Sequence, residues 1–165
     1  MPDRVVICDT SPLIYLHHLQ QVPLLAKLYE KIIVPSAVAE EIETGIRLGY
    51  PGPDLDAFTW LQVRNLPLNQ SSLIIPDLGP GESEVISMAL AYPGCLVIMD
   101  EAIGRQVAKI NDISVTGTAG VLLKAKREGW MSSLADCLER LVRSGFWFDE
   151  ETRLRLLDLA EEFNR

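Results

Sequence analysis

The sequence has few of the residues that a disulfide-stabilised, zinc-binding or membrane-embedded protein requires. Its three cysteines, Cys8, Cys95 and Cys137, form no C-x-x-C pair, and we expect them to be reduced core residues. No zinc-binding pattern is present. No apolar run approaches the roughly 20 residues that span a bilayer, and charged residues near the start argue against a signal peptide. We therefore expect a cytoplasmic protein without a membrane partner.

Positive charge is also scarce. The chain has 15 Lys and Arg against 23 Asp and Glu, a formal net charge of −8. Proteins that bind nucleic acid are usually basic, because contacts of Lys and Arg with phosphate dominate the affinity. This composition excludes a globally basic nucleic-acid surface. Either nucleic acid is not the substrate, or a bound metal and a local basic patch supply the positive field.

What the sequence does contain is an alternation of short β-branched runs and amphipathic segments. This alternation is typical of βαβ units and a parallel sheet. The 165 residues suit one domain with an aliphatic core, since 48% are hydrophobic and only 7% aromatic. We predict strands at residues 4–8, 32–34, 60–64, 95–99 and 113–115, with 60–64 at an edge. We predict helices at 13–19, 23–30, 36–44 (stopped by Gly45), 80–92, 101–110, 118–128, 134–143 and 150–162. The prediction is one α/β domain over residues 1–165, with the helices of about 134–162 packed onto it.

Two aspartates directly follow predicted strands. Asp9 comes after the first strand, and Asp100 comes after the fourth. In parallel α/β sheets, ligands bind at the carboxyl ends of the strands. Asp is also common there as a helix cap, so each residue taken alone is a weak signal. Together they indicate a functional site at this edge of the sheet.

Two glutamates lie on the inward faces of predicted helices. Glu41 shares the apolar stripe of its helix with Ile42, whereas Glu40 projects into solvent. Glu84 lies on a column of packed residues in the helix of 80–92. Glu82, near the start of the same helix, gains from the helix dipole and is a rival for the same role. A buried carboxylate is costly unless it is paired or binds a metal.

A set of four acids fits metal-dependent chemistry. Carboxylates that converge without a cation would repel one another and bind protons more tightly. Oxygen ligands without Cys or His favour Mg²⁺ or Mn²⁺. Such ions activate water and stabilise phosphate charge during an in-line displacement. The residues thus favour metal-assisted hydrolysis of phosphodiester bonds over acyl transfer or redox chemistry.

The order of these motifs resembles that of the PIN-domain nucleases over about residues 4–145. The matching stretches are Asp9-Thr10-Ser11-Pro12-Leu13-Ile14, Val34-Pro35-Ser36-Ala37-Val38 with Glu41-Ile42, Gly81-Glu82-Ser83-Glu84, Ile98-Met99-Asp100-Glu101 and Gly117-Thr118-Ala119-Gly120-Val121. The last stretch is similar to a particular prokaryotic subgroup. The resemblance implies a three-layer α/β/α fold and RNA cleavage, and many relatives are toxins of toxin–antitoxin pairs of the VapC type.

The same resemblance implies the site residues. The first, second, third and fourth acids of the family correspond to Asp9, Glu41, Glu84 and Asp100. These four residues would be both the catalytic residues and the metal ligands. The third acid is usually Asp, and here it is Glu, which leaves Glu82 as an alternative.

Three further residues have two interpretations each. Ser11 matches a hydroxyl that commonly supports the metal site, and it also suits a helix cap. Arg105 is placed to reach a substrate phosphate or to form a surface ion pair. Thr118 begins a helix whose N–H groups suit a phosphate, and it equally suits a simple turn and cap.

Other functions and partners stay open at this stage. A PIN-like module that binds RNA or protein without cutting is one alternative. A haloacid-dehalogenase-type phosphatase expects a second Asp where Ser11 stands, and a response-regulator receiver expects paired acids after its first strand. We expect an RNA substrate and a small basic antitoxin, and a homodimer is compatible with the sequence. A local basic rim for RNA is predicted from Arg105, Lys109, Lys124, Lys126 and Arg127.

Overall fold

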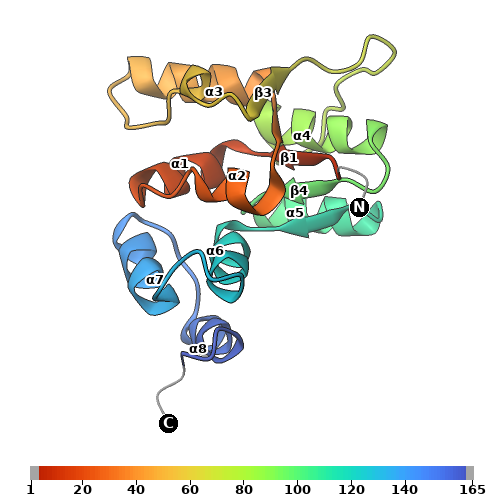
Figure 1. Ribbon diagram of the computed structural model, residues 1–165. Coiled ribbons are helices and arrows are strands. Elements are labelled where there is room, and N and C mark those ends of the chain that lie inside the picture. Colours follow the sequence, from red (N-terminus) through yellow and green to blue (C-terminus); the bar gives the residue numbers. More distant parts are fainter. Residues whose placement is uncertain (1–3, 163–165) are drawn as a thin grey trace.

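A central sheet of five parallel strands organises the protein. The structure is a computed structural model and describes residues 4–162 (Figure 1). The strands are β1 (Val6–Cys8), β2 (Ile32–Pro35), β3 (Leu61–Arg64), β4 (Leu96–Ile98) and β5 (Ser114–Thr116). Their order across the sheet is β3-β2-β1-β4-β5. The most apolar strands, β1 and β2, are buried along their whole length, whereas β3 is an exposed edge. This confirms the predicted parallel α/β sheet and its edge strand.

Helices cover both faces of the sheet and form the outer layers of an α/β/α sandwich. They are α1 (Thr10–His18), α2 (Leu24–Tyr29), α3 (Ser36–Arg47), α4 (Pro80–Ala91), α5 (Ala102–Ile110), α6 (Thr118–Arg127), α7 (Leu134–Arg143) and α8 (Glu150–Leu159), with a 3-10 turn at Leu55–Ala57. Helices α1, α2 and α6 lie on one side and α4 and α5 on the other (Figure 1). Helix α3 contacts both α1 and α4. It therefore brings Glu41 toward the start of α4.

Some helix boundaries differ from the prediction, for identifiable reasons. Helix α1 begins at Thr10, directly after Asp9, because Pro12 falls in its first turn, where proline is tolerated. The prediction that Gly45 ends α3 is wrong, since the helix continues to Arg47. The left-handed residue after it is Gly49, with φ +93°. A glycine at that position is what a helix end requires.

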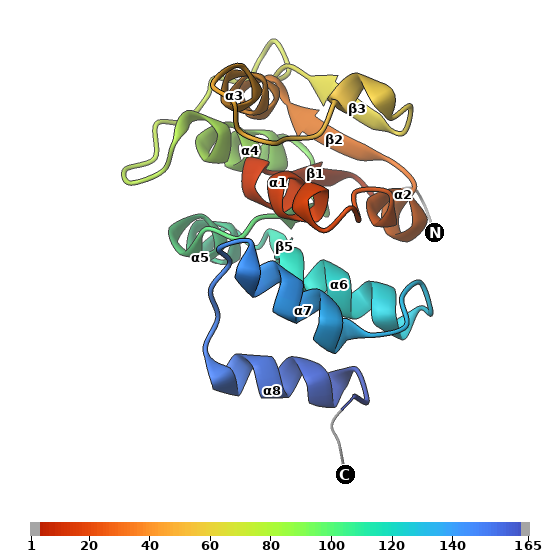
Figure 2. The ribbon, with the colours of Figure 1, turned by 90° about the vertical axis from the view of Figure 1, so that its left-hand side faces the viewer.

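The C-terminal helices extend the fold beyond the sandwich. Helices α7 and α8 contact α6 and each other, and they lie below α6 in Figure 2. Leu138 and Leu141 of α7 are buried. Glu162 accepts hydrogen bonds from Leu134 N (2.6 Å) and Ala135 N (2.8 Å) and pairs with Lys126 Nζ at 2.9 Å. Through these contacts Glu162 joins the start of α7 to Lys126 of α6.

The core consists of aliphatic side chains packed between the layers. Cys8, Cys95 and Cys137 are free and buried, as predicted. Within residues 4–162, no helix is long and apolar enough to cross a membrane.

Candidate active site

Strand register brings Asp9, Asp100 and Thr118 to one place. Cys8 of β1 pairs with Ile98 of β4, and Ile98 pairs with Thr116 of β5. Asp9 N donates to Ile98 O at 3.0 Å. Because the strands are parallel, the residues that follow them leave the same edge of the sheet. Continuing the β4–β5 register by two residues places Asp100 beside Thr118.

Asp9 is a buried carboxylate with an unsatisfied oxygen. Its exposed fraction is 1%, and Oδ1 has no hydrogen-bond partner among the described residues. Burial raises the pKa of Asp9 to about 7, the backbone hydrogen bond of Thr10 lowers it, and the charges of Glu82, Glu41 and Asp100 raise it further. Native proteins rarely leave a buried polar atom without a partner. This atom therefore marks the edge as a place where a cation or proton is needed.

Glu41 is oriented toward this edge by contacts from two other helices. The Thr10 hydroxyl of α1 donates to Oε2 at 2.6 Å, and Gly81 N of α4 donates to Oε1 at 2.9 Å. A Cβ on Gly81 would lie 2.5 Å from Oε2 of Glu41, so any larger residue there would displace the Glu41 carboxylate. Glu40, one residue earlier, is exposed. The two glutamates thus have the opposite orientations that the apolar stripe predicts.

The two glutamates of α4 have different surroundings. Glu82 is half-buried, and its Oε2 accepts from Gly79 N at 2.9 Å, which caps the start of α4. Its charge nevertheless acts on Asp9. Glu84 is also half-buried, but its Oε1 accepts from Ser36 Oγ at 2.9 Å and Ala37 N at 3.4 Å. Glu84 therefore ties α4 to the first turn of α3.

Asp100 is held by Thr118, the first residue of α6. Thr118 N donates to Oδ1 at 2.7 Å, and the fully buried Thr118 hydroxyl donates to Oδ2 at 2.6 Å. Burial raises the pKa of Asp100, while the two Thr118 hydrogen bonds and the charge of Arg105 lower it. Thr118 begins α6 after the turn that follows β5, and both its N–H and its hydroxyl donate to the Asp100 carboxylate. Thr118 positions an acid.

Arg105 lies close to the same acid. Its guanidinium donates to Met99 O at 3.1 Å. A Cβ on Gly117 would lie 2.8 Å from both Arg105 and Asp100, so glycine is needed for their approach. Among the described residues Arg105 forms no salt bridge within 4.0 Å. Its cation therefore remains available beside Asp100.

Thr10 belongs to this arrangement, although the sequence motifs did not single it out as a site residue. The hydroxyl that bonds a site acid belongs to Thr10, whereas Ser11 is half-buried and makes no side-chain hydrogen bond among the described residues. The signal was present, because Thr10 directly follows Asp9 and opens α1. It could not be used without knowing that α3 crosses α1 at this point.

The acids suit a hard divalent cation in their chemistry. All are carboxylates, the ligands that Mg²⁺ and Mn²⁺ prefer, and Asp9 Oδ1 lacks any partner in the part of the chain described. Glu41 and Asp100 are each held by two donors on either side of Asp9. Within residues 4–162, no three His, Cys, Asp or Glu side chains lie close enough together to hold a metal ion. The residues that fit a metal are thus grouped around Asp9 without forming a closed cage.

Comparison with known protein families agrees with this fold. Comparison with curated protein sequences gives no match. A family model described as a PIN domain matches residues 5–162. This match includes every strand, the acids around Asp9 and helices α7 and α8, and so extends past the residues 4–145 expected from the motifs. A PIN domain is in general a nuclease-type fold. The chain belongs to the PIN-domain family.

Proposed function

We propose that this PIN domain is a metal-dependent endoribonuclease that hydrolyses RNA phosphodiester bonds with Mg²⁺ or Mn²⁺. The observation that carries the proposal is the unpaired Oδ1 of Asp9, buried at the carboxyl edge of the sheet beside three acids. A buried ionised carboxylate needs a compensating cation. RNA as the substrate is favoured by the family and by the cationic side chain of Arg105 beside Asp100.

Asp9 would bind the metal through its unpaired oxygen, and Glu41 and Asp100 are the flanking acids that would complete the site when the three draw together. The chemistry supplied at such a site is activation of a water molecule and stabilisation of the charge that develops on the phosphate. Thr118 holds Asp100 through two hydrogen bonds, and Thr10 and Gly81 hold Glu41. Carboxylates held by fixed donors lose little conformational freedom when a ligand arrives. These donors therefore preorganise the site.

The geometry favours Glu82 over Glu84 as the remaining acid. The charge of Glu82 acts on Asp9, whereas the Glu84 carboxylate accepts hydrogen bonds from α3. We expect Glu82→Gln to reduce cleavage more than Glu84→Gln does. The two variants are compared by turnover on the same RNA, with thermal unfolding measured in parallel. The reverse order of activities would assign the role to Glu84.

The central test is cleavage of a labelled single-stranded RNA with Mg²⁺, Mn²⁺ or EDTA. Wild-type protein should cut only with metal. Asp9→Asn should lower the rate more than roughly 100-fold, because even changes to residues behind the metal ligands typically cost 10–100-fold. The matched control is Glu40→Gln, which removes an exposed carboxylate from the same helix as Glu41 and should retain full activity.

Two results would contradict the proposal. One is undiminished cleavage in EDTA or by Asp9→Asn. The other is tight RNA binding without turnover under any metal, which would support the catalytically silent RNA-binding module instead. A generic phosphomonoester and a small phosphodonor serve as further substrates. Turnover of either in place of RNA would point to a phosphatase or a receiver-type protein.

We further propose a toxin role with a small basic antitoxin as partner. The net charge of −8 supports this, since complementary charge accelerates association and selects partners. An Arg or Lys of the partner would enter beside Asp9 and compete with the metal. Induced expression in bacteria should arrest growth for the wild type and not for Asp9→Asn. Co-expression of a small basic protein encoded next to this chain should relieve the arrest. Equal growth of both strains would contradict the toxin role without contradicting the nuclease function.

A further inference from the structure

An exposed tryptophan stands beside the candidate active site. Trp147 lies in the segment that joins α7 to α8, and 81% of its side chain is exposed. Its neighbours Phe146 and Phe148 are half-buried and pack inward. The Phe146 ring meets Tyr15 edge-on at 5.0 Å, and the Phe148 ring lies 5.9 Å from Phe146. The two phenylalanines therefore anchor the segment and leave Trp147 facing outward.

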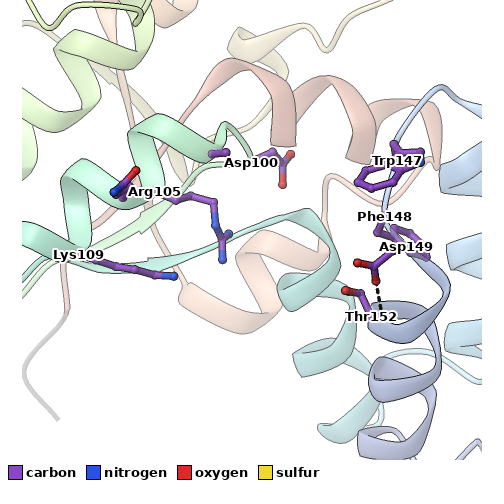
Figure 3. A pocket seen from close by; sticks show the side chains of 9 residues that line it. Asp100, Arg105, Lys109, Trp147, Phe148, Asp149 and Thr152 are labelled. Atoms are coloured by element: carbon purple, nitrogen blue, oxygen red, sulfur yellow. Dashed lines mark hydrogen bonds between the residues drawn. The ribbon is translucent and has the colours of Figure 1, made fainter.

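Trp147 borders a groove that also includes a site acid. The groove has a volume of about 590 Å³ and is formed by α5 on one side and by the start of α8 on the other. Figure 3 shows Arg105 and Lys109 facing Trp147 and Asp149, with Asp100 between them. Sites for small ligands usually measure roughly 300–1,000 Å³. The groove is thus large enough for one nucleotide adjacent to the acid.

The groove has two cations, Arg105 and Lys109, for its two acids, whereas the chain as a whole is acidic. Asp149 caps α8 and accepts from Thr152 N at 2.7 Å, and the hydrogen bonds from Thr152 lower its pKa. Asp100 is bound by Thr118. Within residues 4–162, neither Arg105 nor Lys109 pairs with an acid. An anion entering the groove therefore meets two available cations.

Two other residues of the predicted basic rim, Lys124 and Lys126, are engaged in contacts of their own. Lys124 lies near Glu128 (3.9 Å) and over the Tyr29 ring (4.7 Å), and Lys126 pairs with Glu162 at 2.9 Å. These two lysines of α6 are committed to structural contacts. Arg127 of α6 has no acid within 4.0 Å among the described residues, but it does not line the groove, so the cations of the groove are those of α5.

We propose that this groove is a subsite for a nucleotide that flanks the scissile phosphate of single-stranded RNA. The base would stack on the Trp147 indole, and its phosphate would contact Arg105 and Lys109. This inference rests on the proposed ribonuclease function. Unpaired RNA is recognised mainly by stacking of bases on aromatic rings and by cations along the backbone. An acidic protein needs only such a local arrangement to bind RNA.

The test measures binding apart from cleavage. The probe is a short single-stranded RNA, labelled for fluorescence anisotropy and added with Mg²⁺ to the full chain. The wild type and the tryptophan variants compared in this assay all carry Asp9→Asn, so that hydrolysis by metal-activated water does not consume the probe. Trp147→Ala should weaken its affinity about tenfold, because one stacked base contributes about that much. Trp147→Phe should retain most of the affinity. The matched control is Trp130→Ala, which removes another exposed tryptophan, one that lies between α6 and α7, contacts Lys27 and does not line the groove.

Lysine variants test the phosphate contact. Lys109→Gln should reduce the slope of log affinity against log salt by about 0.7, the value for one phosphate contact on a single strand. Arg127→Gln, a change at an exposed arginine of α6, should leave the slope unchanged. Polyglutamate, an anion without bases, should compete poorly for the groove. Competition as strong as that of RNA would overturn the stacking proposal and indicate an acidic protein partner.

The outcomes separate this inference from the proposed function. RNA binding that depends on Trp147 without turnover would overturn the nuclease and support the subsite. Metal-dependent cleavage with equal affinities for wild type, Trp147→Ala and Trp130→Ala would overturn the subsite alone. Absence of RNA binding by the wild type would overturn both. On a cleavable RNA, Trp147→Ala should raise KM about tenfold with kcat within about twofold, since stacking is expected to be the same in ground and transition states.

Discussion

Asp9 and Asp100 lie one and two residues after the ends of neighbouring strands and have contrasting surroundings. Asp9 is almost fully buried, has an unpaired oxygen and is adjacent to other acids. Asp100 accepts two hydrogen bonds from Thr118 and borders an open groove with Arg105. The position after a strand therefore decides where an acid is placed, and the packed helices decide what it can do. In the proposed function, Asp9 is the acid that most requires a cation, and Asp100 adjoins the path of the substrate.

The largest expected effect concerns the charge of Asp9. Burial raises its pKa from 3.8 to about 7, so the folded protein retains a proton that the unfolded chain has lost. The free energy of unfolding should therefore fall as pH rises from about 4 to about 7. A shift of this size corresponds to at most about 4 kcal/mol, since one pKa unit is about 1.4 kcal/mol. In EDTA, the free energy of unfolding of the Asp9→Asn protein should fall much less over the same pH range.

Urea unfolding of both proteins across a pH series measures the difference. Asp9→Asn should be the more stable protein at pH 8, and the two should converge below pH 4. Mg²⁺ should then stabilise the wild type and not the variant. A stability difference that is constant with pH would show that the buried carboxylate is not the cause.

The next effect concerns the close approach of α4 to Glu41. A Cβ at Gly81 would lie 2.5–2.7 Å from the Glu41 carboxylate, so Gly81→Ala must displace that side chain. We expect a loss of about 1–3 kcal/mol in stability, the usual cost of overpacking, together with loss of RNA cleavage. Denaturant unfolding and turnover are measured on the same preparation. Full activity in Gly81→Ala would contradict the assigned position of Glu41.

A smaller effect is expected where Asp100 is held. Thr118→Val removes the hydroxyl that donates to Oδ2, while the backbone N–H to Oδ1 remains. The cost should be about 1 kcal/mol in the free energy of unfolding. Because these hydrogen bonds lower the pKa of Asp100, their partial loss should raise it, and the acid limb of the pH–rate profile should move to higher pH. Thr118→Ser retains the hydroxyl and should behave like the wild type, and equal profiles for all three proteins would exclude this role of Thr118.

The smallest effect has the opposite sign. Gly45 lies inside α3, and a Cβ at this position would meet nothing within 4 Å. Gly45→Ala should stabilise the protein by up to about 1 kcal/mol, because alanine favours the helix more than glycine does. It also serves as the control for Gly81→Ala. A destabilised Gly45→Ala protein would show that α3 ends near residue 45, as the sequence alone suggested.

How far the sequence predicts this protein depends on the range of the interactions involved. The β-branched runs that alternate with helices predict a parallel sheet. Asp9 and Asp100 follow two of these runs, which places them at the carboxyl edge of the sheet. The orientation of Glu41 follows from the period of one helix. By contrast, the roles of Thr10 and Thr118 depend on contacts between elements 31 and 18 residues apart. The spacing of residues in the sequence does not show which of these elements pack against each other.

The amino-acid sequence by itself determined the PIN-type fold and the edge of the sheet at which its acids gather, because strand and helix periodicity are local properties of the chain. Only the tertiary structure decided which acid is buried without a partner and which α4 glutamate acts on it. It also decided that Trp147 of the α7–α8 connection stands beside Asp100 with Arg105 and Lys109. Desolvation, charge interaction and groove shape arise where segments distant in sequence pack together. That packing sets the pKa of Asp9 and builds the groove.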